Sequence, residues 1–396
     1  MLKLFRLVIA LCAACTAASP ASANPTLVVD IETGAVLHAD EAGLPWYPAS
    51  LTKLMTAYVT FERLRDDREF SLKTELEVSQ LAGAQPPSKM GMEPGTRISV
   101  ARALDALVIY SANDIAYVLA EGVAGSVPAF VERMNATAAR LGMTATTFRN
   151  PNGLPDEGQI STARDLAILA RALIADFPEH AAIFANPVLQ WGKRSLRARN
   201  SLLRTFDGAD GMKTGFICAS GFNVVATATR DGRRLMAVVL GAASGNFRSQ
   251  IAANLLETAF GRGAAPAIEY RTVDTLANVE TGPGGPADLR PQICARSGAH
   301  PQVVKPGQLE GWGTLFGHFD TKKAASARLQ STLRVLRGTI DHGLAAVVPG
   351  AGQSGQAAVL AGLSVDEALA ICDHLAKAGM DCAPLAPGEV NGPAAM

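Results

Sequence analysis

The chain has 396 residues, of which 48% are hydrophobic and 18% charged, with 36 basic and 36 acidic side chains. This composition is that of a globular protein long enough for two or three domains, each with its own core. A formal net charge of zero, with no basic patch among interleaved aromatic residues, gives no reason to expect a nucleic-acid partner.

The first 23 residues have the pattern of an export signal. Lys3 and Arg6 precede a short apolar run, and Ala21-Ser22-Ala23 supplies the small residues that a signal peptidase prefers. The run is too short to span a bilayer core of about 30 Å. We therefore expect cleavage before Asn24, a periplasmic location, and no transmembrane helix in the mature chain.

The cysteines suggest disulfides, because an exported protein enters an oxidising compartment. Two of the six lie in the signal; lipid attachment at one of them, Cys15, is a less favoured alternative, because Cys12-Ala13-Ala14 is a poor approach sequence. The four that remain are Cys218, Cys294, Cys372 and Cys382. They allow three pairings, of which Cys372–Cys382 is the most local and leaves Cys218–Cys294. The alternative is buried free thiols.

Strand and helix patterns alternate in the first part of the chain. Residues 27–40 predict a hairpin, and a helix begins at Pro48 or Ser50 with a buried stripe of apolar residues. Residues 98–125 predict two helices broken near Tyr110-Ser111. Further helices are predicted at 128–142 and 162–178.

The periodicity changes after Gly211. Alternating, β-branched residues predict two or three antiparallel strands with a turn at Asp231-Gly232, and residues 248–261 return to helix. Strands at both ends with helices between them predict one α/β domain over residues 24–265, with an antiparallel sheet. Gly/Pro-rich residues make 266–309 a predicted linker.

The last part of the chain reads as a small separate domain. From residue 310 to 388 the order of predicted elements is βαββαβ, the ferredoxin-like arrangement, followed by a tail at 389–396. Cys372 lies on the second helix of this unit and Cys382 on the next strand, so a disulfide would staple that turn.

Three polar clusters in the first domain suggest nucleophilic catalysis. They are Ser50-Leu51-Thr52-Lys53, Ser111-Ala112-Asn113 and Lys213-Thr214-Gly215. Alone, the first would be a helix N-cap with a solvated lysine, the second a helix break and the third an exposed strand. Together, on a helix start, an interhelical loop and a strand, they are a strong signal.

The segment resembles the D-Ala-D-Ala carboxypeptidase family of penicillin-binding proteins, which has the serine β-lactamase/transpeptidase-like fold. The resemblance covers nearly all of residues 24–265. It rests on the three clusters and on the segments PASLTKLMT, SANDIA, FRNPNGLPD, STARDLA, RNSLL and DGMKTGFICASGFN. It implies a serine peptidase that cleaves the terminal D-Ala from peptidoglycan pentapeptide stems, is acylated by β-lactams, and needs no cofactor or metal.

The chemistry of the residues agrees with this resemblance. Ser50 and Lys53 are one helical turn apart, so the amine can reach the hydroxyl. Lys53 acts as a base only if its pKa is lowered, which burial and the nearby cation of Lys213 would achieve. Ser50 would attack the carbonyl of the penultimate D-Ala, Ser111 would relay a proton to the departing D-Ala, and Asn113 would fix Lys53 and the substrate amide.

The third cluster is expected to bind the substrate. Lys213 and Thr214 would hold its terminal carboxylate, and Gly215 would let its backbone approach the strand edge. The resemblance also implies that the backbone N–H of Phe216 completes an oxyanion hole and that two arginines contact the carboxylate. Those arginines are Arg199 and Arg248.

Other functions share parts of this pattern. A D,D-endopeptidase cleaving cross-links would use the same site, and a non-catalytic cell-wall protein could keep the fold. A class A β-lactamase needs a further carboxylate, usually in Glu-x-x-Leu-Asn, and that motif is absent from the sequence. The histidines have no paired spacing, which speaks against a zinc peptidase.

The C-terminal unit resembles a SPOR (sporulation-related repeat) domain, a module that binds glycan strands stripped of stem peptides. The resemblance rests on Trp312, Gly317-His318-Phe319, Ala324 and the Cys372/Cys382 pair. It implies that denuded glycan strands are a second partner. The alternative is a small stabilising domain without a ligand.

Overall fold

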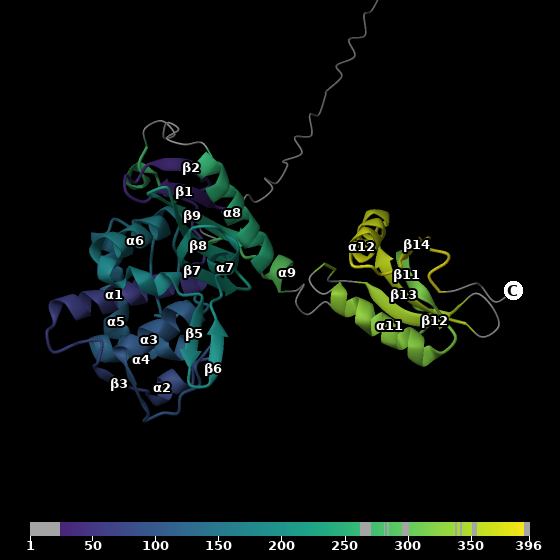
Figure 1. The fold of residues 1–396 in the computed structure, drawn as a ribbon, viewed down its shortest axis with the longest axis horizontal. Coiled ribbons are helices and arrows are strands. Elements are labelled where there is room, and N and C mark those ends of the chain that lie inside the picture. Colours follow the sequence, from purple (N-terminus) through teal and green to yellow (C-terminus); the bar gives the residue numbers. More distant parts are fainter. Residues whose placement is uncertain are drawn as a thin grey trace, which may run out of the picture. The chain divides into compact units, whose positions relative to one another are not determined.

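The computed structural model describes residues 24–261, 271–280, 282, 285–294, 301–336, 339–340, 343–350 and 355–391. The expected export signal at residues 1–23 lies outside them. The chain forms two compact units (Figure 1). Among the described residues, the first comprises those within 24–215 and 222–286, and the second comprises those within 216–221 and 287–391.

The first unit is built on a five-stranded sheet in the order β2-β1-β9-β8-β7. The hairpin of β1 and β2 joins the later strands because β1 pairs antiparallel with β9. The strands are β1 (Thr26–Asp30), β2 (Val36–Asp40), β7 (Ala209–Ile217), β8 (Gly221–Arg230) and β9 (Arg233–Ala242). The antiparallel sheet flanked by helices confirms the predicted fold class.

Apolar residues cover both faces of this sheet. Helix α8 (Gly245–Gly261) packs on one face, where Val224 and Leu235 meet Leu256 in a common core. Helix α6 (Ala163–Asp176) contacts β1 and β9. Strands β8 and β9 are therefore almost fully buried, which explains their continuous apolar runs.

Other helices of the first unit form a helical region beside the sheet (Figure 1). They are the 3₁₀ turn η1 (Ala49–Thr52), α1 (Lys53–Asp66), α2 (Gln80–Gly83), α3 (Val100–Asp105), the π-turn η2 (Ala106–Tyr110), α4 (Asn113–Ala124), α5 (Val127–Arg140) and the 3₁₀ segment η3 (Pro178–Ala185). The short α7 (Leu202–Thr205) packs into the core of the sheet, and the 3₁₀ turn η5 (Val273–Thr275) lies at the β1–β2 turn. Two small hairpins complete the unit: β3 (Glu75–Glu77) with β4 (Arg97–Ser99), and β5 (Val188–Trp191) with β6 (Arg194–Arg197).

Most predicted helices are present, with one difference at the first. The chain from Ala49 to Thr52 is a 3₁₀ turn, and the α-helix begins only at Lys53. The predicted break near Tyr110-Ser111 is present, since Ser111 has a left-handed backbone with φ of 66°.

The second unit has the predicted βαββαβ order. Its elements are β11 (Trp312–Phe319), α11 (Lys322–Val335), β12 (Leu344–Pro349), β13 (Gln356–Leu363), α12 (Val365–Lys377) and β14 (Ala383–Leu385), in a sheet ordered β10-β12-β13-β11-β14. The short α9 (Arg290–Ile293) and β10 (Gln302–Val303) fall inside the predicted linker, and β10 adds a parallel strand beside β12.

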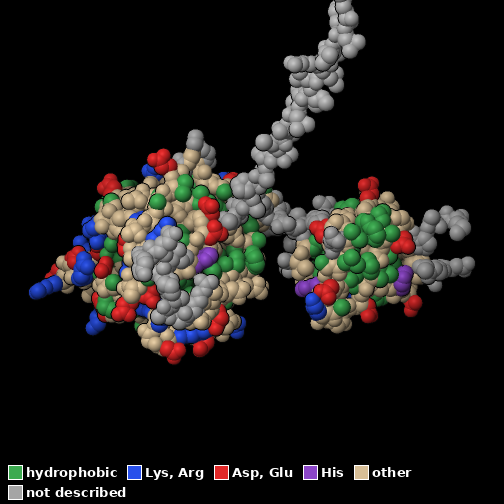
Figure 2. All heavy atoms as spheres, turned by 90° about the horizontal axis from the view of Figure 1, so that it is seen from above, with side chains coloured by type: hydrophobic (Ala, Val, Ile, Leu, Met, Phe, Trp, Pro, Cys, Tyr) green, Lys and Arg blue, Asp and Glu red, His purple; other side chains and the backbone are tan. Residues whose placement is uncertain are grey.

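Each face of the second sheet has its own apolar core. One core joins Phe316 and Leu360 of the strands to Leu329 and Leu375 of the two helices. The other lies on the opposite face, where flanking residues such as Leu309 cover the strands. Figure 2 shows further hydrophobic side chains gathered on one face of this unit.

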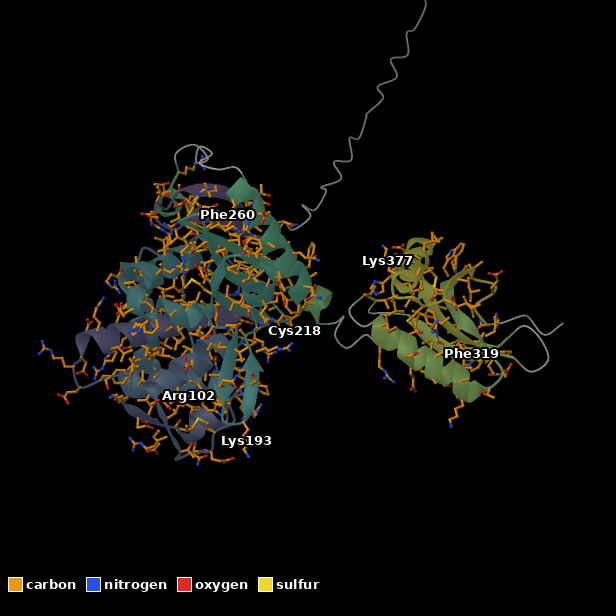
Figure 3. The ribbon with its side chains drawn as sticks, viewed as in Figure 1. Arg102, Lys193, Cys218, Phe260, Phe319 and Lys377 are labelled. Atoms are coloured by element: carbon orange, nitrogen blue, oxygen red, sulfur yellow. A yellow bond between two sulfur atoms is a disulfide. The ribbon has the colours of Figure 1, made fainter. Side chains whose placement is uncertain are left out.

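Both expected disulfides are present. Cys372 and Cys382 are joined across the turn between α12 and β14. Cys218, just beyond β7 (Figure 3), is joined to Cys294, 76 residues later.

Within the described residues, no single helix has the length and hydropathy needed to cross a membrane. Helices α4 and α5 reach that length and hydropathy only as a pair, and the pair is bent by 85°.

Candidate active site

Ser50 lies in the tight turn that precedes α1. Its neighbour Ala49 has a left-handed backbone with φ of 48°, a conformation that costs a non-glycine residue energy and that recurs at functional sites. The turn leaves Ser50 partly exposed, while its chain neighbours Ala49 and Leu51 are buried. The serine hydroxyl is thus presented at the surface of a packed framework.

Lys53, the first residue of α1, lies almost completely buried beneath Ser50. Its Nζ donates to Ser50 Oγ at 3.0 Å, to Asn113 Oδ1 at 2.8 Å and to the carbonyl oxygen of Asn152 at 2.5 Å. Burial is the main reason that the pKa of Lys53 lies well below its usual value, and the charge of Lys213 lowers it further. The nearby carboxylate of Asp114 acts in the opposite direction.

Ser111 and Asn113 stand on the two sides of the break before α4. The left-handed backbone at Ser111 turns the chain so that Asn113 becomes the first residue of the helix. Asn113 faces Lys53, whereas Ser111 Oγ accepts a hydrogen bond of 2.8 Å from Lys213 Nζ. The two residues therefore contact different lysines.

Lys213 and Thr214 are both buried on β7, and Gly215 follows them. Burial, followed by the charges of Arg199 and Arg248, lowers the pKa of Lys213 to about 7. Three basic side chains therefore share a small region at this end of the site, which suits an anionic ligand.

Gly215 has a role in the protein's own packing. A Cβ at this position would lie 2.8 Å from the carbonyl oxygen of Pro48 and 3.1 Å from the backbone nitrogen of Ser50. Only glycine therefore allows β7 to lie against the turn that carries Ser50. Phe216, the next residue on β7, has 43% of its side chain exposed.

The two candidate arginines differ in their surroundings. Arg199 is exposed, donates to Ser88 Oγ at 3.3 Å and lies over the ring of Tyr110, 5.5 Å from its centre. Arg248, on α8, is buried, and its Nε has no hydrogen-bond partner among the described residues. Burial lowers the pKa of Arg248 to about 10.

The structure adds residues to which the sequence analysis assigned no role. The backbone carbonyl of Asn152 accepts from Lys53, and the side chain of Asn152 donates to Gln85 Oε1 at 3.0 Å. Asn152 lies in FRNPNGLPD, a segment that carried the family resemblance. A backbone acceptor has no side-chain signature, so the segment was the only signal available.

The geometry defines the chemistry that these groups can perform. A lysine with a lowered pKa lies within hydrogen-bonding distance of a serine hydroxyl, as a general base must. A second lysine, beside a second serine, is flanked by two arginines that could hold a carboxylate. Ser50, Lys53, Ser111, Asn113 and Lys213 are thereby brought together.

In the first unit an antiparallel sheet is flanked by helices, and a serine and two lysines lie between its edge strand and the helical region. This arrangement defines a penicillin-binding-protein type of fold and site. The chain belongs to the D-alanyl-D-alanine carboxypeptidase family, whose sequence profile matches residues 13–244.

Named relatives and solved structures agree with this assignment. The chain is 39% identical over 245 residues to D-alanyl-D-alanine carboxypeptidase DacC of Escherichia coli K12, covering 60% of this chain and 61% of that protein. It is 36% identical over 244 residues to DacA of Haemophilus influenzae, covering 60% and 62%. The chain thus spans less than two thirds of the length of these relatives.

Among solved structures, penicillin binding protein 5 from Haemophilus influenzae matches with a TM-score of 0.58 and 35% identity, over 60% of this chain and 70% of that one. Penicillin-Binding Protein D2 from Listeria monocytogenes, in its cefotaxime-bound form, matches with a TM-score of 0.55 and 32% identity, over 60% and 97%. The matching fold is therefore that of the first unit.

Proposed function

We propose that the chain is a serine-type D-Ala-D-Ala carboxypeptidase that removes the terminal D-Ala from peptidoglycan pentapeptide stems. The observation that carries the proposal is the contact of Lys53 Nζ with Ser50 Oγ, at 3.0 Å, in a site where the pKa of Lys53 is lowered. β-Lactams would acylate the same serine, in keeping with the β-lactam-bound structures among the matches.

Acylation begins when neutral Lys53 takes the proton of Ser50 Oγ. The oxygen attacks the carbonyl carbon of the penultimate D-Ala, and the backbone N–H groups of Ser50 and Phe216 stabilise the oxyanion that forms. The carbon–nitrogen bond then breaks, and a proton reaches the departing amine through Ser111. Free D-Ala and a Ser50 ester are the products of this half-reaction.

Deacylation reverses these roles. Water adds to the ester carbonyl, giving its proton to Lys53, and the carbon–oxygen bond to Ser50 breaks. Ser50 recovers its proton, and the shortened stem leaves with a new terminal carboxylate. The chain's own residues supply every proton transfer.

The cationic end of the site would select a substrate with a terminal carboxylate. Lys213 and Thr214 would hold that carboxylate, with Arg199 and Arg248 adding charge. Asn113 would hydrogen-bond the substrate amide while it holds Lys53. A peptide bound along β7 would extend the sheet by one strand.

The proposal is tested by D-alanine release from a soluble pentapeptide, compared with cleavage of a cross-linked dimer. We expect release from the pentapeptide by the wild-type chain and none by the Ser50→Ala variant. Cleavage of the dimer alone would identify a D,D-endopeptidase instead, and release by Ser50→Ala would exclude Ser50 as the nucleophile.

We also propose that the chain acts in the periplasm and that its second unit binds denuded glycan strands. The resemblance of residues 310–388 to a SPOR domain supports the glycan partner, as does the exposed Trp312, whose ring could stack on a sugar. Sedimentation with amidase-treated sacculi tests it. Equal binding by a chain lacking residues 310–396 would contradict it.

A further inference from the structure

An irregular segment, residues 85–91, lies beside the site between α2 and β4. Its main chain is bonded to the first two residues of α4. Asn113 donates from its backbone nitrogen to Ser88 O at 2.7 Å and from Nδ2 to Pro86 O at 3.0 Å. The segment is therefore attached to the residue whose Oδ1 accepts from Lys53.

Asp114 holds the other end of the same segment. Its Oδ1 accepts from the backbone nitrogen of Met90 at 3.0 Å, and its Oδ2 accepts from that of Gly91 at 2.9 Å. Oδ1 also accepts from the backbone nitrogen of Ile115 at 2.9 Å. The side chain is completely buried, and the hydrogen bonds that it accepts from the described residues all come from backbone N–H groups.

A buried carboxylate that is bonded only to backbone N–H groups is costly unless those groups are held in place. Two of the three groups, those of Met90 and Gly91, belong to a segment without helix or strand bonding of its own, so the carboxylate and the segment stabilise each other. Loss of the carboxylate would free the segment at Met90 and Gly91. The bonds of Pro86 and Ser88 to Asn113 would then lose the support of this end of the segment.

We propose that Asp114 is a positioning residue of the acylation site: its carboxylate latches segment 85–91 onto α4 and thereby keeps Asn113 facing Lys53. The latch stands on the hydrogen bonds alone. An electrostatic part, which concerns Lys53 as the base, rests on the proposed function.

Charged groups on two elements act on the pKa of Lys53. Lys213 on β7 disfavours its protonated form, and Asp114 on α4 favours it. Arg199 and Arg248 act on Lys213 in turn. Removal of the Asp114 charge therefore lowers the pKa of Lys53, so that the base is available at lower pH.

The latch is tested first by hydrogen exchange of the wild-type chain. The amides of Met90 and Gly91 should exchange slowly although they lie outside helix and strand, and the Gly91 amide should exchange faster in Asp114→Asn, whose side-chain NH₂ faces it. Rapid exchange at both amides in the wild type would overturn the latch, whether or not the variant folds.

The electrostatic part is tested by the pH dependence of acylation by a fluorescent penicillin. In Asp114→Asn the acid limb should move to lower pH. The plateau rate should fall about tenfold or more. The matched control is Asp156→Asn, which removes an exposed carboxylate and should leave the limb in place.

An unchanged limb in Asp114→Asn, or one moved to higher pH, would overturn the electrostatic part. If Asp114 had only a packing role, Asp114→Asn would lower the plateau rate of acylation and leave the pH of the acid limb unchanged. Absence of any labelling in the wild type would instead refute the proposed function, while the exchange result for Met90 and Gly91 would still decide the latch.

Discussion

At the scale of single residues, the site contains two buried lysines, and the charge of one lowers the pKa of the other. Burial and the charge of Lys213 lower the pKa of Lys53, as the proposed base requires. Lys213 itself has a pKa of about 7, because it is buried beside two arginines. Lys213 therefore loses its positive charge as the pH rises through the neutral range, and with that charge it loses its effect on the pKa of Lys53.

Replacing Lys213 should therefore change the titration of Lys53. In Lys213→Gln the repelling charge is gone, so the pKa of Lys53 rises and the acid limb of penicillin acylation moves to higher pH. This is the opposite direction to Asp114→Asn. The rate of covalent labelling, measured from pH 5 to 10, checks both variants, and shifts of the same sign in the two would contradict this electrostatic account.

Replacing Lys53 by arginine separates hydrogen bonding from basicity. Arginine holds its proton more tightly than lysine, so Lys53→Arg keeps hydrogen-bond donors but removes the neutral base. We expect acylation to slow by about 10²- to 10⁴-fold. Stopped-flow labelling measures the rate, with thermal unfolding as the control for folding; acylation within threefold of wild type would show that Lys53 is not the base.

At the residue scale, the sequence predicted the site residues whose side chains belong to the family motifs. Ser50 and Lys53 could be paired because one helical turn separates them. The acceptor role of Asn152 O and the latch of Asp114 could not, since both depend on backbone groups brought together by loops that are distant in the chain. The spacing of side chains along the sequence does not indicate such contacts.

At the scale of elements, the turn that carries Ser50 is packed between two segments that approach it at glycines. Gly215 brings β7 against Ser50, and Gly153 brings the loop after Asn152 against Ala49. A Cβ at Gly153 would lie 1.9 Å from the Ala49 carbonyl oxygen, and its φ of 83° is left-handed. These two approaches hold the strained Ala49 backbone in place.

Gly153→Ala should therefore lower both stability and acylation. A matched control is Gly142→Ala, whose φ of 76° is similar but whose Cβ would meet no atom within 4 Å. The backbone cost of about 1–2 kcal/mol is common to both variants and lowers Tm by roughly 2–8 °C. Only Gly153→Ala should lower Tm further and slow labelling; equal effects of the two on labelling would contradict the packing argument.

Elements with long periodic patterns were predictable, and short ones were not. The helices near 128–142 and 162–178 and the strands after Gly211 carry clear apolar periods. The hairpins β3–β4 and β5–β6 have strands of three or four residues, too short for a period and rich in charged side chains. The 3₁₀ turn at Ser50 follows from the packing of Gly153 and Gly215 rather than from local propensity.

At the scale of the whole molecule, the two units have separate cores. The core of the first joins its sheet to α8, and the cores of the second lie on the faces of another sheet. Separate cores predict two unfolding transitions in calorimetry rather than one. A single cooperative transition would contradict their independence.

The Cys372–Cys382 disulfide should affect only one of these transitions. Replacing both cysteines by serine reopens a short loop, with an expected loss of about 2–3 kcal/mol from the second unit. Its transition should fall by at least about 8 °C, while that of the first unit and the penicillin-labelling rate stay unchanged. A matching fall in the other transition would show that the units unfold together.

The central claim is that Ser50 forms the acyl-enzyme, and peptide mapping after labelling with a fluorescent penicillin tests it most directly. The account predicts that the label resides on Ser50 of the wild-type chain and is absent from a folded Ser50→Ala variant. A label on any other residue, or persistent labelling of Ser50→Ala, would contradict it.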